Sequence, residues 1–235
     1  MATEACLICG APLFYLEQGA EMECASCHKR FISNASCENG HFICDVCHGE
    51  LGIQAIRDLC QRETEMDPIR LAQRMMALPA VHLHGPEHHV LVGSALLTAY
   101  HNAGGRLDKA AALEEMARRG REVPGGACGF WGCCGAAISA GIYWSIATDT
   151  TPLDQKNWGL ANRLVAACLE EIGGVGGPRC CKRDSFLAIQ TAVIFTKEHL
   201  GVAMAVPQRV QCGYFSQNAE CIQAGCPFYS KEELR

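Results

Sequence analysis

The sequence lacks any long uncharged apolar run. No stretch reaches the roughly 18–20 residues that a membrane-spanning helix needs, so we expect no membrane segment and no membrane partner. The first residues, MATEACLICG, contain no charged region followed by an apolar run, so we predict no signal peptide. These two absences together predict a cytoplasmic protein.

Excess positive charge and strand-like patterns are scarce as well. The formal net charge is −5, whereas nucleic-acid-binding proteins generally carry a basic excess, so we do not expect a nucleic-acid partner for the whole chain. After residue 50 no segment shows convincing apolar–polar alternation, which favours helices there. The hydrophobic content of 49% is sufficient for a core, and 235 residues suit one ordinary domain with a small appended one.

Cysteine, by contrast, is abundant, with 17 in the chain. Because disulfides are rare in reducing compartments, this number of thiols favours metal binding or thiol chemistry. The adjacent pairs Cys133–Cys134 and Cys180–Cys181 suit metal chemistry better than ordinary disulfides. We infer a cytoplasmic protein of an organism whose interior is reducing or anaerobic.

Residues 1–50 form a predicted zinc-binding module. Pairs of cysteines two residues apart allow one turn to present both thiolates to the same ion. The eight candidate ligands, enough for two zinc ions, are Cys6, Cys9, Cys24, Cys27, Cys37, His41, Cys44 and Cys47. Their order permits two pairings, either four consecutive ligands to each ion or a cross-brace.

The run from Cys37 to Cys47 (CENGHFICDVC) resembles the central part of Sina-type RING fingers. The resemblance implies a docking module for a protein partner. The alternative, which we favour, is a small fold that zinc holds together, because 50 residues bury too little apolar surface by themselves.

Residues 51–235 are predicted to form an all-α domain of roughly six helices with cysteine-bearing loops at one end. The fold class is therefore mainly α, with a small zinc-ribbon or treble-clef-like N-terminal module. Capping and periodicity predict helices that start at Asp67-Pro68, at Thr151-Pro152, and at Asp184 or Ser185, and the last of them should end at Leu200, before Gly201. Further predicted helices are 90–100, 107–119 and 136–147, and the alanine, serine and glycine residues of the last predict close packing against other helices.

Two glycine-rich turns, 125–135 and 176–184, carry further cysteines, and each leads into an apolar helix. A helix N-terminus favours thiolates, so we expect lowered thiol pKa values there. We predict that the turns face each other around an iron–sulfur cluster or a reactive thiolate. Cys128, Cys134 and Cys180 as ligands would leave one iron open to a substrate, and Cys181 is a further candidate.

Charged and histidine side chains near these turns are candidate catalytic groups. Lys182, Arg183 and Asp184 could bind a carboxylate or move a proton, or could form a solvated charged cap. His88 could act as an acid or base, or could bind a metal together with His84, and helix capping is the alternative.

The tail contains Cys212, Cys221 and Cys226, the last followed by proline as in many iron–sulfur ligand runs. These three cysteines could form a separate metal site, contribute to the first cluster, or act as reactive thiols.

The segment from Cys180 to Ile189 resembles a cysteine segment of iron–sulfur-dependent L-serine dehydratases, and related L-cysteine desulfidases have a comparable arrangement. Cys128 with the stretch 132–140 is similar to their glycine- and alanine-rich segment. The resemblance implies that Cys128 and Cys180 are cluster ligands and that Cys168 stands at a third ligand position.

Over nearly its whole length the chain resembles an uncharacterised cysteine-rich family of methanogens and other anaerobes, through the segments 88–93, 131–132 and 177–185 and the terminal cysteines. This resemblance implies no particular activity.

Three functions follow as hypotheses. The first is an iron–sulfur-dependent lyase or sulfurtransferase acting on a small thiol or hydroxy-acid substrate. The second is a redox or sulfur carrier. The third is a zinc module that docks to protein or nucleic acid. A homodimer is compatible with each of them.

Overall fold

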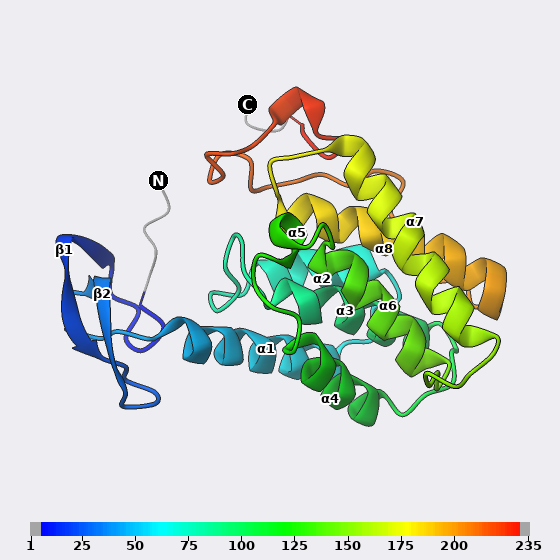
Figure 1. Cartoon of the computed structure of the whole chain (residues 1–235), viewed down its shortest axis with the longest axis horizontal. Helices are drawn as coiled ribbons and strands as arrows, with labels where there is room; N and C mark the ends of the chain where they lie inside the picture. The colour runs from blue at the N-terminus through cyan, green and yellow to red at the C-terminus, as the bar shows by residue number, and fades with distance from the viewer. Residues whose placement is uncertain (1–5, 231–235) are drawn as a thin grey trace.

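The computed structural model describes residues 6–230. The N-terminal module contains one hairpin, in which β1 (Leu13–Glu23) pairs antiparallel with β2 (Arg30–Cys37). The register joins Leu13 to Cys37 and Glu23 to Arg30, with an irregularity after Tyr15. The hairpin stands to one side of the helical domain (Figure 1).

Helix α1 (Asp45–Arg62) connects this module to the helical domain. It begins directly after Cys44, one of the predicted zinc ligands, and its later residues Ile53, Ile56 and Cys60 are buried in the core of the helical domain. One continuous helix thus carries metal-ligand candidates at one end and core side chains at the other. The predicted division at residue 50 falls inside it.

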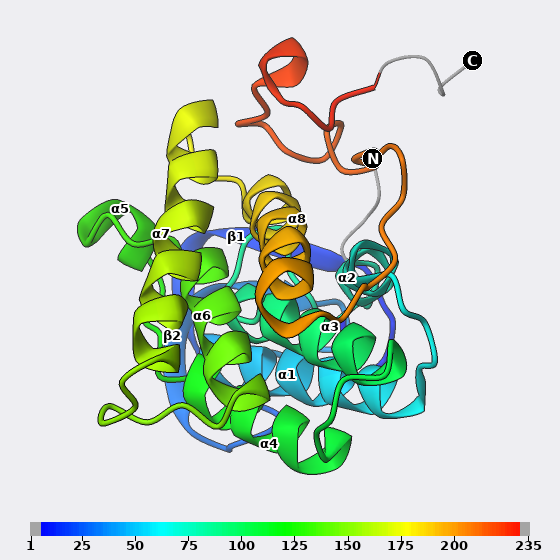
Figure 2. The same cartoon turned by 90° about the vertical axis from the view of Figure 1, so that its right-hand side faces the viewer.

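The helical domain is built around α3 (His88–Asn102). The other α-helices are α2 (Pro68–Met76), α4 (Lys109–Gly120), α5 (Ala127–Phe130), α6 (Gly135–Ala147), α7 (Asn157–Val175) and α8 (Cys181–Leu200). Helices α1, α2, α4, α6 and α8 all contact α3 (Figures 1 and 2). Because α3 is enclosed by neighbours, its residues are apolar on every face rather than along one stripe.

Small residues bring α3 and α6 close together. The Gly93 N–H donates to Ser139 Oγ at 2.9 Å, and a Cβ at Gly93 would collide with the Met116 side chain. The predicted close packing of the alanine- and glycine-rich helix is confirmed, since most of α6 is buried.

The predicted helix starts had mixed outcomes. Asp67 caps α2, accepting from the N–H groups of Ile69 and Arg70 at 2.9 and 3.2 Å. The start at Pro152 is wrong, because the Asp154 carboxylate binds the N–H groups of Lys156 and Asn157, and α7 begins only at Asn157.

The predicted start of α8 is also wrong. The N-cap is Cys180, not Asp184 or Ser185. Asp184 instead lies one turn inside the helix and accepts from the Cys180 N–H at 3.4 Å, so it reaches back to the cap from within. The predicted end is confirmed, because Gly201 follows Leu200 with a φ of 70°.

The fold class is confirmed as mainly α with a small cysteine-bearing module. The described residues form eight α-helices rather than roughly six, one of them the four-residue α5 inside the first glycine-rich turn. None of the helices between residues 6 and 230 has the length and apolar character required to cross a membrane.

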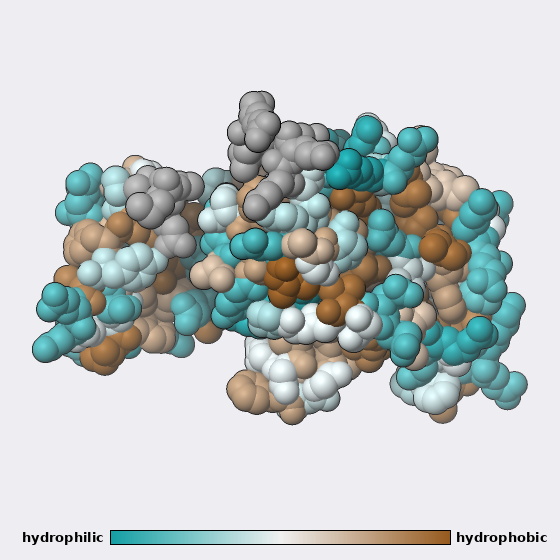
Figure 3. Space-filling model, turned by 90° about the horizontal axis from the view of Figure 1, so that it is seen from above, coloured by the Kyte–Doolittle hydropathy of each residue, from teal (hydrophilic) through white to brown (hydrophobic). Residues whose placement is uncertain are grey.

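The segment after α8 passes along α2 and then over the end of the domain where α8 begins (Figure 2). The Ala205 N–H donates to Met66 O at 3.0 Å, and Phe228 is buried against Phe186. Between residues 201 and 230, the regular structure of this segment is the 3-10 helix η1 (Gln223–Gly225) alone. Seen from above, this end of the molecule mixes hydrophilic side chains with apolar ones, which gather near the middle of the helical domain (Figure 3).

Candidate metal centres

The N-terminal ligands form two separate sets of four. Cys6, Cys9, Cys37 and His41 form one set, and Cys24, Cys27, Cys44 and Cys47 form the other; within each set the ligand atoms lie within 4.8 Å of one another. Cys9 Sγ is 3.8 Å from Cys37 Sγ, close to the roughly 3.8 Å expected for two thiolates on one tetrahedral zinc ion. The sets interleave along the chain, so the pairing is the cross-brace.

The hairpin and α1 explain this pairing. Antiparallel pairing of β1 with β2 places Leu13, just after the first cysteine pair, opposite Cys37. Cys24 forms a bridge to Phe42, which brings the turn after β1 beside the start of α1. Cys44 is the N-cap of that helix, and its N–H donates to Cys24 Sγ at 3.3 Å. Each set therefore combines two cysteines from one short turn, here called a knuckle, with a pair of ligands from later in the chain.

Hydrogen bonds favour the thiolate at two cysteines of the module, whereas burial raises the pKa of Cys6 and the pKa of Cys47 is raised to about 12. The Asn39 amide, 3.4 Å from Cys9 Sγ, and nearby backbone N–H groups lower the pKa of Cys9 to about 6. For Cys24, burial acts in the opposite direction, but the N–H groups of Cys44 and Cys27 outweigh it and also lower the pKa to about 6. Metal ligands must be deprotonated, so this environment suits a cation.

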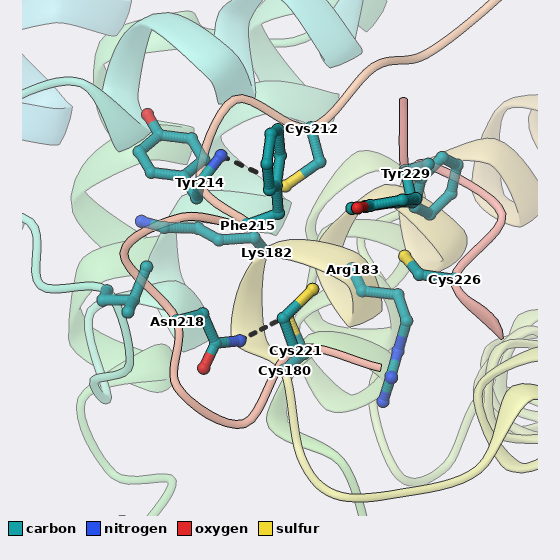
Figure 4. A pocket seen from close by; sticks show the side chains of 12 residues that line it. Cys180, Lys182, Arg183, Cys212, Tyr214, Phe215, Asn218, Cys221, Cys226 and Tyr229 are labelled. Atoms are coloured by element: carbon teal, nitrogen blue, oxygen red, sulfur yellow. Dashed lines mark hydrogen bonds between the residues drawn. The ribbon is translucent and has the colours of Figure 1, made fainter. Parts of the chain in front are cut away.

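A third group of thiols lines a small cavity at the other end of the molecule. Cys180 comes from the start of α8, Cys212 from the segment after it, and Cys221 and Cys226 flank η1. Their side chains point toward a common space (Figure 4). Cys180 and the three tail cysteines therefore border the same cavity.

Two of these thiols share a local geometry with the zinc module. In the knuckle, the Ile8 N–H donates to the sulfur of Cys6, two residues earlier, at 3.4 Å. The same bond, at the same length, runs from Tyr214 to Cys212 and from Gln223 to Cys221. Cys180 Sγ is approached by the Asn218 amide at 3.9 Å. Such donors stabilise a negatively charged sulfur.

The spacing of the cavity thiols differs from that of the zinc sets. Within the part of the chain that the structure describes, no three of the four sulfurs lie within 4.8 Å of one another. A single tetrahedral zinc ion would need its thiolates about 3.8 Å apart. The four cavity cysteines are therefore less closely gathered than either four-ligand set of the N-terminal module.

Burial, not the helix N-terminus, dominates the thiol pKa values at the two glycine-rich turns. Burial raises the pKa of Cys134 to about 12, reinforced by the Asp184 charge, and raises that of Cys181 to about 11. Burial also raises the pKa of Cys180. The expectation of lowered values is therefore wrong, since backbone N–H groups oppose burial but do not outweigh it. These thiols stay protonated unless a cation replaces the proton.

The two turns do come together, and Asp184 lies between them. Its Oδ2 is 3.9 Å from Cys134 Sγ and accepts from the Cys180 N–H at 3.4 Å. Cys128, Cys134 and Cys181 are absent from the cavity lining, whereas Cys180 is part of it. Cluster ligation by Cys128, Cys134 and Cys181 stays a prediction.

Lys182, Arg183 and Asp184 are all buried, so the alternative of a solvated charged cap is wrong. The Arg183 guanidinium donates to Asp184 Oδ1 at 3.0 Å and to the carbonyl oxygens of Gly176 and Pro178 at 2.7 and 3.0 Å. Arg183 therefore fixes the loop that leads to Cys180. Carboxylate binding or proton transfer by Arg183 and Asp184 stays a prediction.

Lys182 extends from α8 to the cavity wall. Its Nζ donates to His82 O at 3.0 Å, lies 3.3 Å from His88 Nε2, and sits 4.8 Å above the centre of the Tyr214 ring. Burial lowers the pKa of Lys182 to about 8, while the negative charge of Glu87 acts in the opposite direction.

His88 lies behind Lys182. Its Nδ1 is 3.2 Å from Gly85 O, to which it donates, leaving Nε2 to accept from Lys182. Burial and the Lys182 charge lower the pKa of His88 to about 3, so the ring is neutral near pH 7. His84 instead contacts Asn218, at 3.4 Å, so the two histidines have different partners. A catalytic role for His88 stays a prediction.

The residues that sequence reasoning missed are Glu87, His82, Tyr214 and Asn218. Glu87 is fully buried, and its Oε1 accepts from the His82 N–H at 2.7 Å and lies 3.3 Å from the His82 ring. His82 in turn stacks on His48 of α1, with ring centres 3.5 Å apart. The histidine-rich segment signalled this region, whereas nothing in the sequence marked Tyr214 or Asn218.

We predict that Glu87 makes stability dependent on acid pH. Burial alone would raise its pKa, but the His82 hydrogen bonds and the His88 ring outweigh it and lower the pKa from 4.5 to about 2. A lowered carboxyl pKa stabilises the fold above pH 4.5, and this contribution is lost as pH falls toward 2. Glu87→Gln should lower stability at pH 7 by about 3 kcal/mol. The deficit, measured by thermal unfolding of both proteins, should shrink below pH 4.5; a constant deficit would contradict the prediction.

The fold and its ligand sets define a class: a cysteine-rich helical protein with two four-ligand sets able to hold metal ions. Residues 56–229, well over half of the chain, match the family described as "Family of unknown function (DUF5714)", and the chain belongs to this family. No curated protein and no solved structure gives a significant match. The matched span includes the four cavity cysteines and begins after the last zinc-ligand candidate.

Proposed function

We propose that this protein binds two zinc ions in its N-terminal module and an iron–sulfur cluster at Cys180, Cys212, Cys221 and Cys226, and that it serves as a redox or sulfur carrier of the cytoplasm. The observation that carries the proposal is the meeting of four cysteines from three chain segments around one cavity. When bound, such a cluster takes up and releases single electrons. A reducing or anaerobic interior suits this role.

The number of ligands favours a carrier over an open-iron enzyme. Three cysteines would leave one iron free to polarise a substrate, whereas four cysteines complete the usual ligand set of a [4Fe–4S] cluster. Phe215, Phe228 and Tyr229 also line the cavity. An apolar wall excludes water and limits the side reactions of an inorganic cluster.

A second candidate function is elimination or sulfur transfer on a small thiol or hydroxy-acid substrate. The observation in its favour is the buried Lys182–His88 pair beside the cavity, because a lysine with a lowered pKa can move protons near neutral pH. Release of sulfide or pyruvate from cysteine or serine by the iron-loaded protein would support this function. Reversible reduction without turnover would favour the carrier.

The iron site is tested by anaerobic purification followed by measurement of iron, labile sulfide, zinc and the visible spectrum. We expect Cys212→Ser and Cys226→Ser to lose most of the iron and the visible absorption while retaining two zinc ions per chain. Cys128→Ser and Cys133→Ser are matched controls, half-buried thiols outside the cavity, and should keep the iron.

Two results would contradict the proposed site. Zinc as the sole metal of the anaerobically purified protein would remove the cluster altogether. Loss of iron on Cys128→Ser, with retention on Cys212→Ser, would instead support the three-cysteine site of Cys128, Cys134 and Cys180. In that case an open iron and a lyase reaction would become the better hypothesis.

A further inference from the structure

Lys182 is the buried cation of the cavity. Its side chain is 1% exposed, yet it lines the same cavity as the four thiols (Figure 4). Arg183, the other basic lining residue, is held by Asp184 and two carbonyl groups. Among the described residues, the direct partners of the Lys182 ammonium are neutral: the His82 carbonyl, the His88 ring and the face of the Tyr214 ring.

The counter-charge of Lys182 lies on the side away from the cavity. Glu87 is fully buried and is not part of the cavity lining. Its Oε1 is held by His82 and lies 4.0 Å from His88 Nδ1, whereas Lys182 contacts the opposite ring nitrogen, His88 Nε2. Lys182 and Glu87 therefore form a buried dipole across His88, and Lys182, its positive end, is the residue of the two that lines the cavity.

We propose that the charge of Lys182 raises the reduction potential of the metal group held by Cys180, Cys212, Cys221 and Cys226. The charge of Glu87 lowers the same potential. The inference rests on the iron–sulfur site proposed above. Reduction adds one negative charge within the cavity. A nearby buried cation stabilises that charge more strongly than the same cation would at the water-exposed surface. The N-terminus of α8, which carries Cys180, contributes with the same sign.

This arrangement predicts shifts of opposite sign in two variants. Lys182→Met keeps the long apolar stem and removes the charge, so the potential should become more negative. A tenfold loss in the equilibrium constant for one-electron reduction corresponds to a shift of about 59 mV in the reduction potential. Glu87→Gln keeps the shape and removes the negative charge, so its potential should become more positive by a smaller amount, because Glu87 lies farther from the cavity.

The experiment is an anaerobic redox titration of the iron-loaded protein, followed by absorbance and electron paramagnetic resonance. Lys182→Arg is the charge-preserving control and should shift the potential less than Lys182→Met. General damage to the fold would move Lys182→Met and Glu87→Gln in the same direction, so shifts of the same sign would overturn the proposal. Unchanged potentials in both variants, with normal iron content, would also overturn it.

Failure of the site itself would look different. If the wild-type protein holds no iron, or if Cys212→Ser retains it, the proposed function fails before any potential is measured. Tyr214→Leu removes the ring below the ammonium but keeps the charge of Lys182, so it does not replace Lys182→Met. If Lys182→Met cannot be isolated, the sign of the shift in reduction potential of Glu87→Gln decides, and a negative shift would overturn the proposal.

Discussion

We expect the double variant Cys6→Ser/Cys37→Ser to retain one zinc ion per chain and Cys6→Ser/Cys24→Ser to retain none. In the cross-brace, Cys6 and Cys37 belong to the same set, so their loss leaves the set of Cys24, Cys27, Cys44 and Cys47 intact. Cys6 and Cys24 belong to different sets, so their loss removes two sulfurs from the module but damages both sites.

The energetic effect should be large, because so small a module buries little core of its own and we expect metal to hold it together. Structural zinc sites contribute apparent binding energies of about 10–16 kcal/mol near pH 7. Loss of both ions should therefore unfold the hairpin, whereas α3 and its neighbours keep their own core. Elemental analysis gives the zinc content, and amide hydrogen exchange shows which strands lose protection.

Consecutive pairing would reverse the two results. Cys6→Ser/Cys37→Ser would then damage both sites, and Cys6→Ser/Cys24→Ser would damage only one. Substitution of Ser33, which is not a ligand candidate and bonds Ala35 within the hairpin, to alanine controls for changes to the hairpin and should keep both ions.

We expect Asp184→Ala to destabilise the helical domain by about 3–5 kcal/mol. The reason is that Arg183, 3% exposed, would lose the one carboxylate that it contacts among residues 6–230 and remain a buried, unpaired charge. The Cys180 N–H would also lose its acceptor, and the loop 176–180 would loosen. Because this loop carries Cys180, iron content should fall together with stability. Chemical denaturation measures the stability loss.

The control is Asp154→Ala, a half-buried carboxylate that binds the first N–H groups of α7. Its loss should cost only about 1 kcal/mol, as for an ordinary helix cap, with the iron content unchanged. The double variant Arg183→Met/Asp184→Leu removes both charges and should recover part of the stability lost in Asp184→Ala. Equal losses in Asp184→Ala and in the double variant would show that burial of the unpaired arginine is not the cause.

Local signals in the sequence predicted elements that depend on neighbouring residues alone. Asp67-Pro68 predicted the start of α2, and Gly201 predicted the end of α8, because capping needs only adjacent side chains and a left-handed glycine. The same reasoning failed at Thr151 and Asp184. Thr151 lies in a turn that precedes the helix, and Asp184 bonds the N-cap from within the helix. The spacing of polar residues alone does not distinguish these cases from a true N-cap.

The candidate sites show the same division. The candidate ligands of the N-terminal module could be named from their spacing, because two thiols presented by one short turn can bind one ion whatever surrounds them. The cavity could not be predicted as a unit, since Cys180 and Cys226 are brought together only by the return of the tail over α8. The thiol pKa values at Cys134 and Cys181 were mispredicted, because burial depends on neighbours that are remote in sequence.

The sequence by itself determined the mainly helical class, the eight ligands of the N-terminal module and the presence of thiol-bearing helix starts. These features follow from periodicity, ligand spacing and glycine turns, which are local. The tertiary structure alone decided the cross-brace pairing, the grouping of Cys180 with the tail cysteines, and the burial of Lys182 beside them. Each of these depends on which distant segments pack together, and packing sets both the distances between ligands and the exclusion of water around a charge.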